Sequence, residues 1–157
     1  MEKTVEVIAD FNELGRTKEW FELAVPNPTI ENQCVQVGCH YEEVVEMMFA
    51  IQGGNTPLSD TLNCVANAYK EKACAQMKHC ELMSQEEKVA LLDALCDQIV
   101  TAIGVAHMFN MDISGAMKEV NDSNFSKFVD GKPVFNENGK IKKGPDYRPP
   151  ELEQFID

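Results

Sequence analysis

Apolar side chains recur at intervals of three and four residues through most of the chain, the spacing that places them on one face of an α-helix. Short polar segments containing proline or glycine separate these runs. The stretch MKHCELM, residues 77–83, is ambiguous and is interpreted as a loop. The pattern predicts helices over residues 4–24, 30–52, 57–77, 84–109 and 112–121.

Local signals mark the ends of these predicted helices. Ser84 and Glu87 have the spacing of a capping box, in which each side chain bonds to the other residue's backbone N–H. Proline fits the first turn of a helix but not its continuation, and glycine favours the turn that ends one. The remaining boundaries are assigned on these grounds, together with an N-cap aspartate, to Pro26 and Pro28, Gly53, Pro57 and Asp112.

The predicted helix over residues 84–109 is the most apolar segment, with large aliphatic side chains on nearly all of its faces. Such a helix is expected to be surrounded by other helices. Residues 122–157 are polar and rich in glycine and proline, with a possible small hairpin around Asn138-Gly139. The sequence therefore predicts an all-α fold: one domain, an antiparallel four- to five-helix bundle with an irregular C-terminal arm.

Three glutamates lie within two turns of the predicted helix 30–52. Glu42 and Glu46 are four residues apart, and Glu43 and Glu46 are three apart, so their side chains are neighbours on the helix surface. Clustered carboxylates repel one another unless solvent or a cation lies between them. The cluster therefore predicts either a solvated acidic face or a metal site.

A second pair of carboxylates, Asp93 and Asp97, lies inside the apolar helix 84–109. An ionised carboxylate removed from water is costly unless it is paired or binds a metal. Pairing with a basic residue from elsewhere is one explanation, although no Lys or Arg lies between Lys88 and Lys118. If the two acidic faces meet, they provide an oxygen-ligand site suited to Mg²⁺ or Mn²⁺.

Composition argues against several classes of function. The 157 residues carry a formal net charge of −12, which argues against a nucleic-acid-binding surface. No apolar run is expected to span a bilayer, and the charged N-terminus does not look like a signal peptide, so a cytoplasmic location is expected. The six cysteines include no Cys-x-x-Cys pair and match no usual zinc spacing, so they are interpreted as reduced thiols.

Three segments in the same order resemble a known superfamily, the all-α nucleoside triphosphate pyrophosphohydrolases, which include MazG-like, dCTPase-like and dimeric dUTPase-like enzymes. They are the EExxE face at residues 42–46, the carboxylate pair on the later apolar helix, and an ending with SNFSK and PDYRPP. The ending resembles the longer phage and bacterial MazG-like branch. The resemblance covers roughly residues 28–150.

The resemblance implies Mg²⁺-dependent cleavage of a nucleoside triphosphate to the monophosphate and pyrophosphate. It places metal ligands at Glu43, Glu46 and Asp97, and makes Glu42 or Glu43 the group that orients the attacking water. One position departs from the family's ExxD motif, because Ala94 stands three residues before Asp97 and Asp93 would have to substitute. The resemblance implies substrate-contacting groups at Asn124 and Lys127, and Lys140, Lys143 and Tyr147 on the arm are weaker candidates, whose alternative is a solvated tail.

The superfamily's members also form dimers or tetramers, so a homodimer or homotetramer is expected. A non-catalytic helical protein that binds a nucleotide or a partner is the alternative, motivated by Ala94. A di-iron carboxylate bundle would need Glu-x-x-His motifs, which this sequence lacks.

Overall fold

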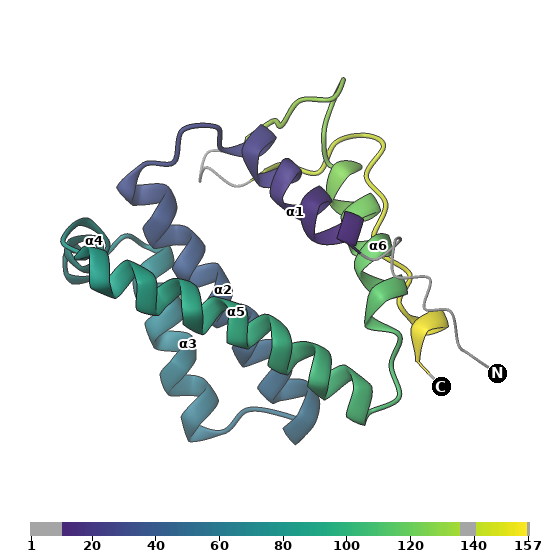
Figure 1. Ribbon diagram of the computed structural model, residues 1–157, viewed down its shortest axis with the longest axis horizontal. Helices are drawn as coiled ribbons and strands as arrows, with labels where there is room; N and C mark the ends of the chain where they lie inside the picture. The colour runs from purple at the N-terminus through teal and green to yellow at the C-terminus, as the bar shows by residue number, and fades with distance from the viewer. Residues whose placement is uncertain (1–10, 136–140, 157) are drawn as a thin grey trace, which may run out of the picture. The chain divides into compact units, whose positions relative to one another are not determined.

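The computed structural model describes residues 11–135 and 141–156, and this part of the chain is all-α, with six α-helices, one short 3₁₀ helix and no strand longer than an isolated bridge (Figure 1). The predicted fold class is confirmed. The chain divides into two compact units, one formed by residues 27–92 and the other by residues 1–26 with 93–157.

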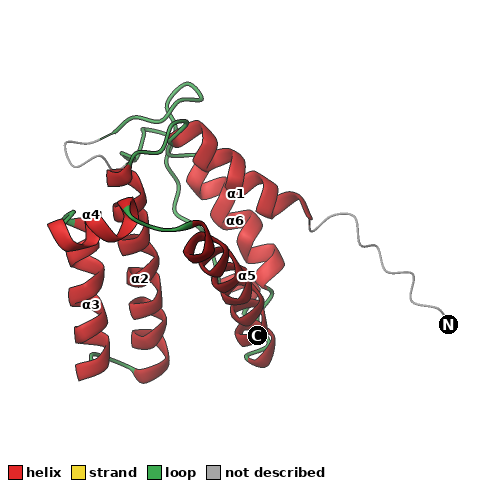
Figure 2. Cartoon of the chain, turned by 60° about the vertical axis from the view of Figure 1, so that its left-hand side comes forward, coloured by secondary structure: helices red, strands yellow, loops and turns green. Residues whose placement is uncertain are grey.

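The unit of residues 27–92 is built on an antiparallel pair of helices, α2 (Ile30–Gln52) and α3 (Pro57–Lys70), which lie side by side (Figure 2). Thr29 and Thr56 close capping boxes at their N-termini. Gly53 ends α2 with φ 70°, a left-handed conformation that favours glycine, and Pro57 occupies the first turn of α3. The predicted ends of α2 and the start of α3 are therefore confirmed.

Close approach of α2 to α3 depends on Gly38, which is buried. A Cβ atom at this position would lie 2.6 Å from the Ala66 carbonyl oxygen and 2.8 Å from the Lys70 backbone nitrogen. Neither backbone atom can move without separating the helices, so Gly38→Ala is expected to lower the free energy of unfolding by about 2 kcal/mol. Urea unfolding measures this change.

A matched control for Gly38 is Gly15, a helical glycine whose added Cβ would meet nothing within 4 Å. Gly15→Ala is expected to leave the unfolding free energy unchanged or to raise it by up to about 1 kcal/mol, since alanine is the better helix former. Equal stability of the two variants would show that the contact at Gly38 does not limit the packing of α2 on α3.

A short helix, α4 (Cys74–Glu81), occupies much of the stretch interpreted as a loop, and the prediction that α3 continues to residue 77 is wrong. The break comes at Lys72, whose φ of 55° is left-handed, while the Ala73 N–H bonds back to the Ala68 carbonyl. Glu71 and Lys72 are good helix formers, so no local signal announces this break. α4 packs against both α2 and α3.

The other unit contains α1 (Phe11–Ala24) packed against α6 (Ile113–Phe125). Asp112 caps α6 as predicted, accepting a hydrogen bond from the Gly115 N–H at 3.0 Å, although the helix ends four residues later than expected. The predicted first helix began at residue 4, and its first seven residues lie outside the described part of the chain.

A buried polar residue joins α1 to α6. Asn121 is 1% exposed, and its Nδ2 donates to the Glu13 carbonyl at 3.0 Å and to the Glu13 carboxylate at 2.9 Å. Its Oδ1 accepts a hydrogen bond from the Thr17 hydroxyl at 2.9 Å. Because every polar atom of this amide is satisfied, its burial fixes the register between the two helices.

The C-terminal arm is irregular, as predicted. A tight turn at Asp130 and Gly131, both with positive φ, is closed by a bridge between Val129 and Lys132. Phe135 and Ile141 form an isolated antiparallel bridge, which is consistent with the predicted hairpin, although Asn138-Gly139 lies outside the described residues. The arm ends in a 3₁₀ helix, Glu153–Phe155, next to the start of α6.

The longest helix, α5 (Gln85–Met108), begins with the predicted capping box, in which the Glu87 N–H donates to Ser84 Oγ and the Ser84 N–H to the Glu87 carboxylate. Within the unit of residues 27–92, α2, α3 and α4 do not pack along the start of α5, and in the other unit α1 and α6 do not pack along the rest of it. Most α5 side chains are exposed. That other helices surround α5 stays a prediction, because the helix runs from one unit into the other.

By length and hydropathy alone, α5 meets the criteria for a segment that crosses a membrane, so the expectation that no apolar run is long enough to span a bilayer is wrong. The core helix of a soluble protein meets the same criteria. Asp93 and Asp97 lie within this helix.

Candidate functional site

The three glutamates of α2 do not share one environment. Glu43 and Glu46 are exposed, whereas Glu42 is half-buried and accepts a hydrogen bond from Lys70 Nζ at 2.6 Å. Lys70 is the last residue of α3, and its side chain is 17% exposed. Glu42 is therefore already ion-paired before any reaction begins. Its partner, Lys70, is a candidate site residue that was not predicted from the sequence.

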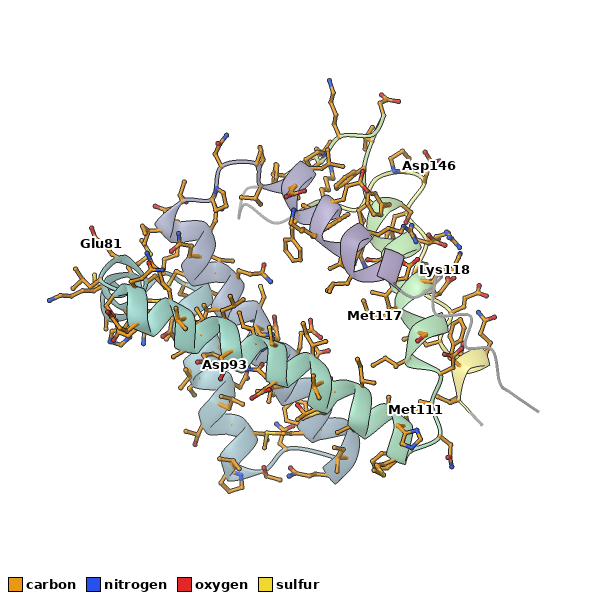
Figure 3. The ribbon with its side chains drawn as sticks, in the orientation of Figure 1. Glu81, Asp93, Met111, Met117, Lys118 and Asp146 are labelled. Atoms are coloured by element: carbon orange, nitrogen blue, oxygen red, sulfur yellow. The ribbon has the colours of Figure 1, made fainter. Side chains whose placement is uncertain are left out.

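Asp93 and Asp97 are exposed on α5, and Figure 3 shows Asp93 on this helix. Both carboxylates were expected to be buried, and no described helix of their own unit covers them. Within this unit, the cost of burying a charge gives no reason to expect a cation at these two residues. What remains is their spacing, which places both carboxylates on one side of α5.

The two carboxylate groups belong to different units: Glu42, Glu43 and Glu46 to residues 27–92, and Asp93 and Asp97 to the other. Among residues 11–135 and 141–156, no three His, Cys, Asp or Glu side chains are grouped so that they could hold a metal ion. Joint metal binding by the two groups stays a prediction.

The structure brings together two of the predicted substrate-contacting residues. Lys127 Nζ donates to Asn124 Oδ1 at 2.7 Å and lies 5.8 Å from the centre of the Trp20 ring. The Trp20 indole in turn donates to the Asn124 carbonyl at 3.0 Å. The cation, the amide and the aromatic ring form one cluster, hereafter the Trp20 cluster, which offers a positive charge beside a flat apolar surface.

The two halves of the C-terminal motif are bonded to each other. The Ser123 hydroxyl, which is buried, donates to the Arg148 carbonyl at 2.8 Å, and Ser126 Oγ accepts from the Arg148 N–H at 3.1 Å. The two serines of SNFS, three residues apart on the end of α6, thus hold the backbone of PDYRPP against the helix that carries Asn124.

Charged side chains reinforce the same end of α6. Asp122 accepts hydrogen bonds from Arg16 at 2.6 Å and from Lys118 at 3.0 Å, and Arg148 lies 3.7 Å from it. The bonds from Arg16 and then Lys118 lower the pKa of the Asp122 carboxyl below its usual value. This carboxylate therefore stays ionised and ties α1, α6 and the arm into one unit; Figure 3 labels Lys118 on α6.

Lys143 and Tyr147 also meet, with the Lys143 ammonium 4.5 Å from the centre of the Tyr147 ring. Lys143 lines a pocket of about 290 Å³ together with Lys142, Val129 and Val134. The two predicted arm residues therefore act as one cation–aromatic pair. Lys140 lies outside the described residues.

Trp20, Lys70 and Arg148 were not predicted as site residues from the sequence. Each reaches its partner over a long separation in the chain, so local spacing carries no signal for it. Ser123 and Ser126 do carry a local signal, since two hydroxyls three residues apart at the end of a helix can form hydrogen bonds to the backbone of a neighbouring segment.

Comparison with known proteins finds no match among family models, curated proteins or solved structures.

Proposed function

We propose that this protein is a Mg²⁺-dependent nucleotide pyrophosphohydrolase, which cleaves a nucleoside triphosphate to the monophosphate and pyrophosphate. The observation that carries the proposal is the joining of SNFSK to PDYRPP. Two segments that the resemblance links to nucleotide binding lie side by side, with Lys127 and Asn124 together in the Trp20 cluster.

The carboxylates suit a hard divalent cation, because Glu43, Glu46, Asp93 and Asp97 offer only charged oxygen atoms and are exposed to solvent. In the proposed enzyme these four residues would hold Mg²⁺, with Mn²⁺ as a substitute. The bound ion would offset the negative charge of the triphosphate and of the transition state. On α5, Ala94 stands at the position where the ExxD motif has its first carboxylate, so that carboxylate is missing.

The remaining roles fall to side chains of the chain itself. Glu42 or Glu43 orients the attacking water and accepts its proton. If Glu42 does so, Lys70, whose Nζ donates a hydrogen bond to the Glu42 carboxylate at 2.6 Å, holds that carboxylate in place before the substrate binds. Lys127 and Lys143 attract the phosphates, while Asn124 and the ring of Tyr147 contact the base or sugar. We also propose that the protein is cytoplasmic and works as a homodimer or homotetramer.

The test is a panel of ribo- and deoxyribonucleoside triphosphates incubated with the purified protein and Mg²⁺. We expect stoichiometric monophosphate and pyrophosphate from at least one nucleotide, measured by anion-exchange chromatography, and no product in EDTA. Release of inorganic phosphate and the nucleoside diphosphate instead would contradict the proposed cleavage to monophosphate and pyrophosphate. Absence of any product from folded, metal-loaded protein would contradict the enzyme class.

A second candidate function, nucleotide binding without turnover, is favoured by one observation. Glu42 is already engaged by Lys70, and Ala94 offers no compensating carboxylate. Isothermal titration with a triphosphate in the presence of Mg²⁺ separates the two functions. A binder retains intact nucleotide after prolonged incubation, whereas the enzyme returns monophosphate.

A further inference from the structure

The unit of residues 27–92 contains a pocket of about 610 Å³ whose wall is made by α2, α3, α4 and the start of α5. Tyr41 and Tyr69 form one side, their rings 5.8 Å apart and inclined at 68°. Cys80, near the end of α4, lies in the same wall and is half-buried. A small oxidant entering the pocket can therefore reach a thiol.

Cys34 lies behind this wall. It is 0% exposed, and its thiol donates a hydrogen bond to the Tyr69 carbonyl at 3.4 Å. Burial raises the pKa of Cys34, and the Cys80 thiol, which is hydrogen-bonded to it, raises that pKa further. α2 and α4, the helices that carry the two cysteines, pack directly against each other.

We propose that Cys34 and Cys80 are a redox-active pair, in which the pocket-lining Cys80 is oxidised by a peroxide and the buried Cys34 resolves it to an intramolecular disulfide. The juxtaposition of one reachable and one buried thiol carries this inference, which is independent of the proposed enzymatic activity. The cross-link would tie α4 to α2 and enclose all of α3 in a covalent loop.

The chemistry proceeds in two balanced steps. The Cys80 thiol attacks one oxygen of the peroxide and becomes a sulfenic acid, while the O–O bond breaks and one water or alcohol leaves. The Cys34 sulfur then attacks the Cys80 sulfur, the S–O bond breaks, and a second water leaves with the Cys34 proton. Two thiols lose two electrons, and the peroxide gains them.

Cys34, a neutral and inaccessible thiol, is a poor first target because the thiolate is the nucleophile. The four other cysteines provide internal comparisons, since Cys64, Cys74 and Cys96 are exposed and Cys39 is half-buried. If accessibility alone decided oxidation, these exposed thiols would react before Cys34.

The test treats the full-length protein with low concentrations of hydrogen peroxide, blocks the remaining thiols with an alkylating reagent, and maps the peptides without reduction. We expect one cross-linked pair, Cys34–Cys80, whose mass is lower by two hydrogens and which dithiothreitol separates. Cleavage at glutamate leaves Cys34 and Cys39 on the same peptide, so fragment-ion sequencing must distinguish them.

Two comparisons decide the outcome. Cys80→Ser should leave Cys34 as an unmodified thiol, whereas Cys74→Ser, six residues away in the same helix, should leave the cross-link unchanged. Protein unfolded in urea should give a mixture of pairs. A wild-type protein in which Cys80 becomes oxidised while Cys34 stays a free thiol, or in which Cys34 pairs with another cysteine, would overturn the proposal.

Discussion

Glu46→Gln is expected to reduce pyrophosphate release by about 100-fold or more without unfolding the protein. Glu46 is exposed on α2, so its amide analogue needs no new partner and leaves the packing of α2 on α3 intact. The amide keeps one oxygen but removes the charge that attracts Mg²⁺. The loss should therefore be accompanied by a higher metal concentration for half-maximal rate, measured by titrating Mg²⁺ at saturating nucleotide.

Matched controls separate loss of a ligand from loss of charge. Glu31→Gln changes an exposed carboxylate on the same helix, which forms a 3.3 Å ion pair with Lys72, and should retain activity. Asp97→Asn on α5 should reproduce the Glu46 defect. Full activity in both Glu46→Gln and Asp97→Asn would remove these carboxylates from the mechanism, even if the nucleotide panel shows turnover.

The ends of helices were predictable wherever a residue that starts or stops a helix lies at the boundary. Gly53, Pro57, Ser84 and Asp112 each act locally, and the helices begin or end beside them. The break after Lys70 was not predictable, because Glu71 and Lys72 favour a helix, whereas the structure has a left-handed turn at Lys72 followed by α4, which packs on α2 and α3.

Burial was harder to predict than helicity. An apolar circumference indicates that a helix avoids water, but it does not identify the partner. For α5, this reasoning assumed helices of the same bundle, and Asp93 and Asp97 then looked like buried charges. In the structure α1 packs on α6, and no described helix of their own unit covers the two aspartates, which are exposed.

Only some of the contacts in the Trp20 cluster could be predicted from the sequence. The bond between Asn124 and Lys127 follows from their spacing of three residues in SNFSK. Trp20 comes from another helix and Arg148 from the arm, so only the fold reveals that they meet there. Joint use of the α2 and α5 carboxylates stays a prediction, since the two groups lie in separate units.

The apolar side of α5 is expected to pair with a second copy of this chain. Leu91, Leu95, Ile99 and Ile103 form a continuous stripe at four-residue spacing, and each is between 37% and 49% exposed. A soluble monomer rarely leaves so long an apolar stripe in water, because burying it is strongly favourable. Within each unit, no described helix packs along it. Packing against the identical stripe of a second copy would bury the apolar side chains of both copies. The opposite side of α5, with Asp93 and Asp97, would stay uncovered.

Introducing a charge in this stripe should therefore dissociate the oligomer. Ile99→Glu is expected to lower the mass measured by light scattering from a multiple of 17.6 kDa to 17.6 kDa, because an unpaired carboxylate would have to enter an apolar interface. Ala90→Glu adds the same charge on the opposite side of α5, and should keep the oligomer. A wild-type protein that is monomeric, or one that is recovered with membranes through α5, would show that a second copy does not cover this helix.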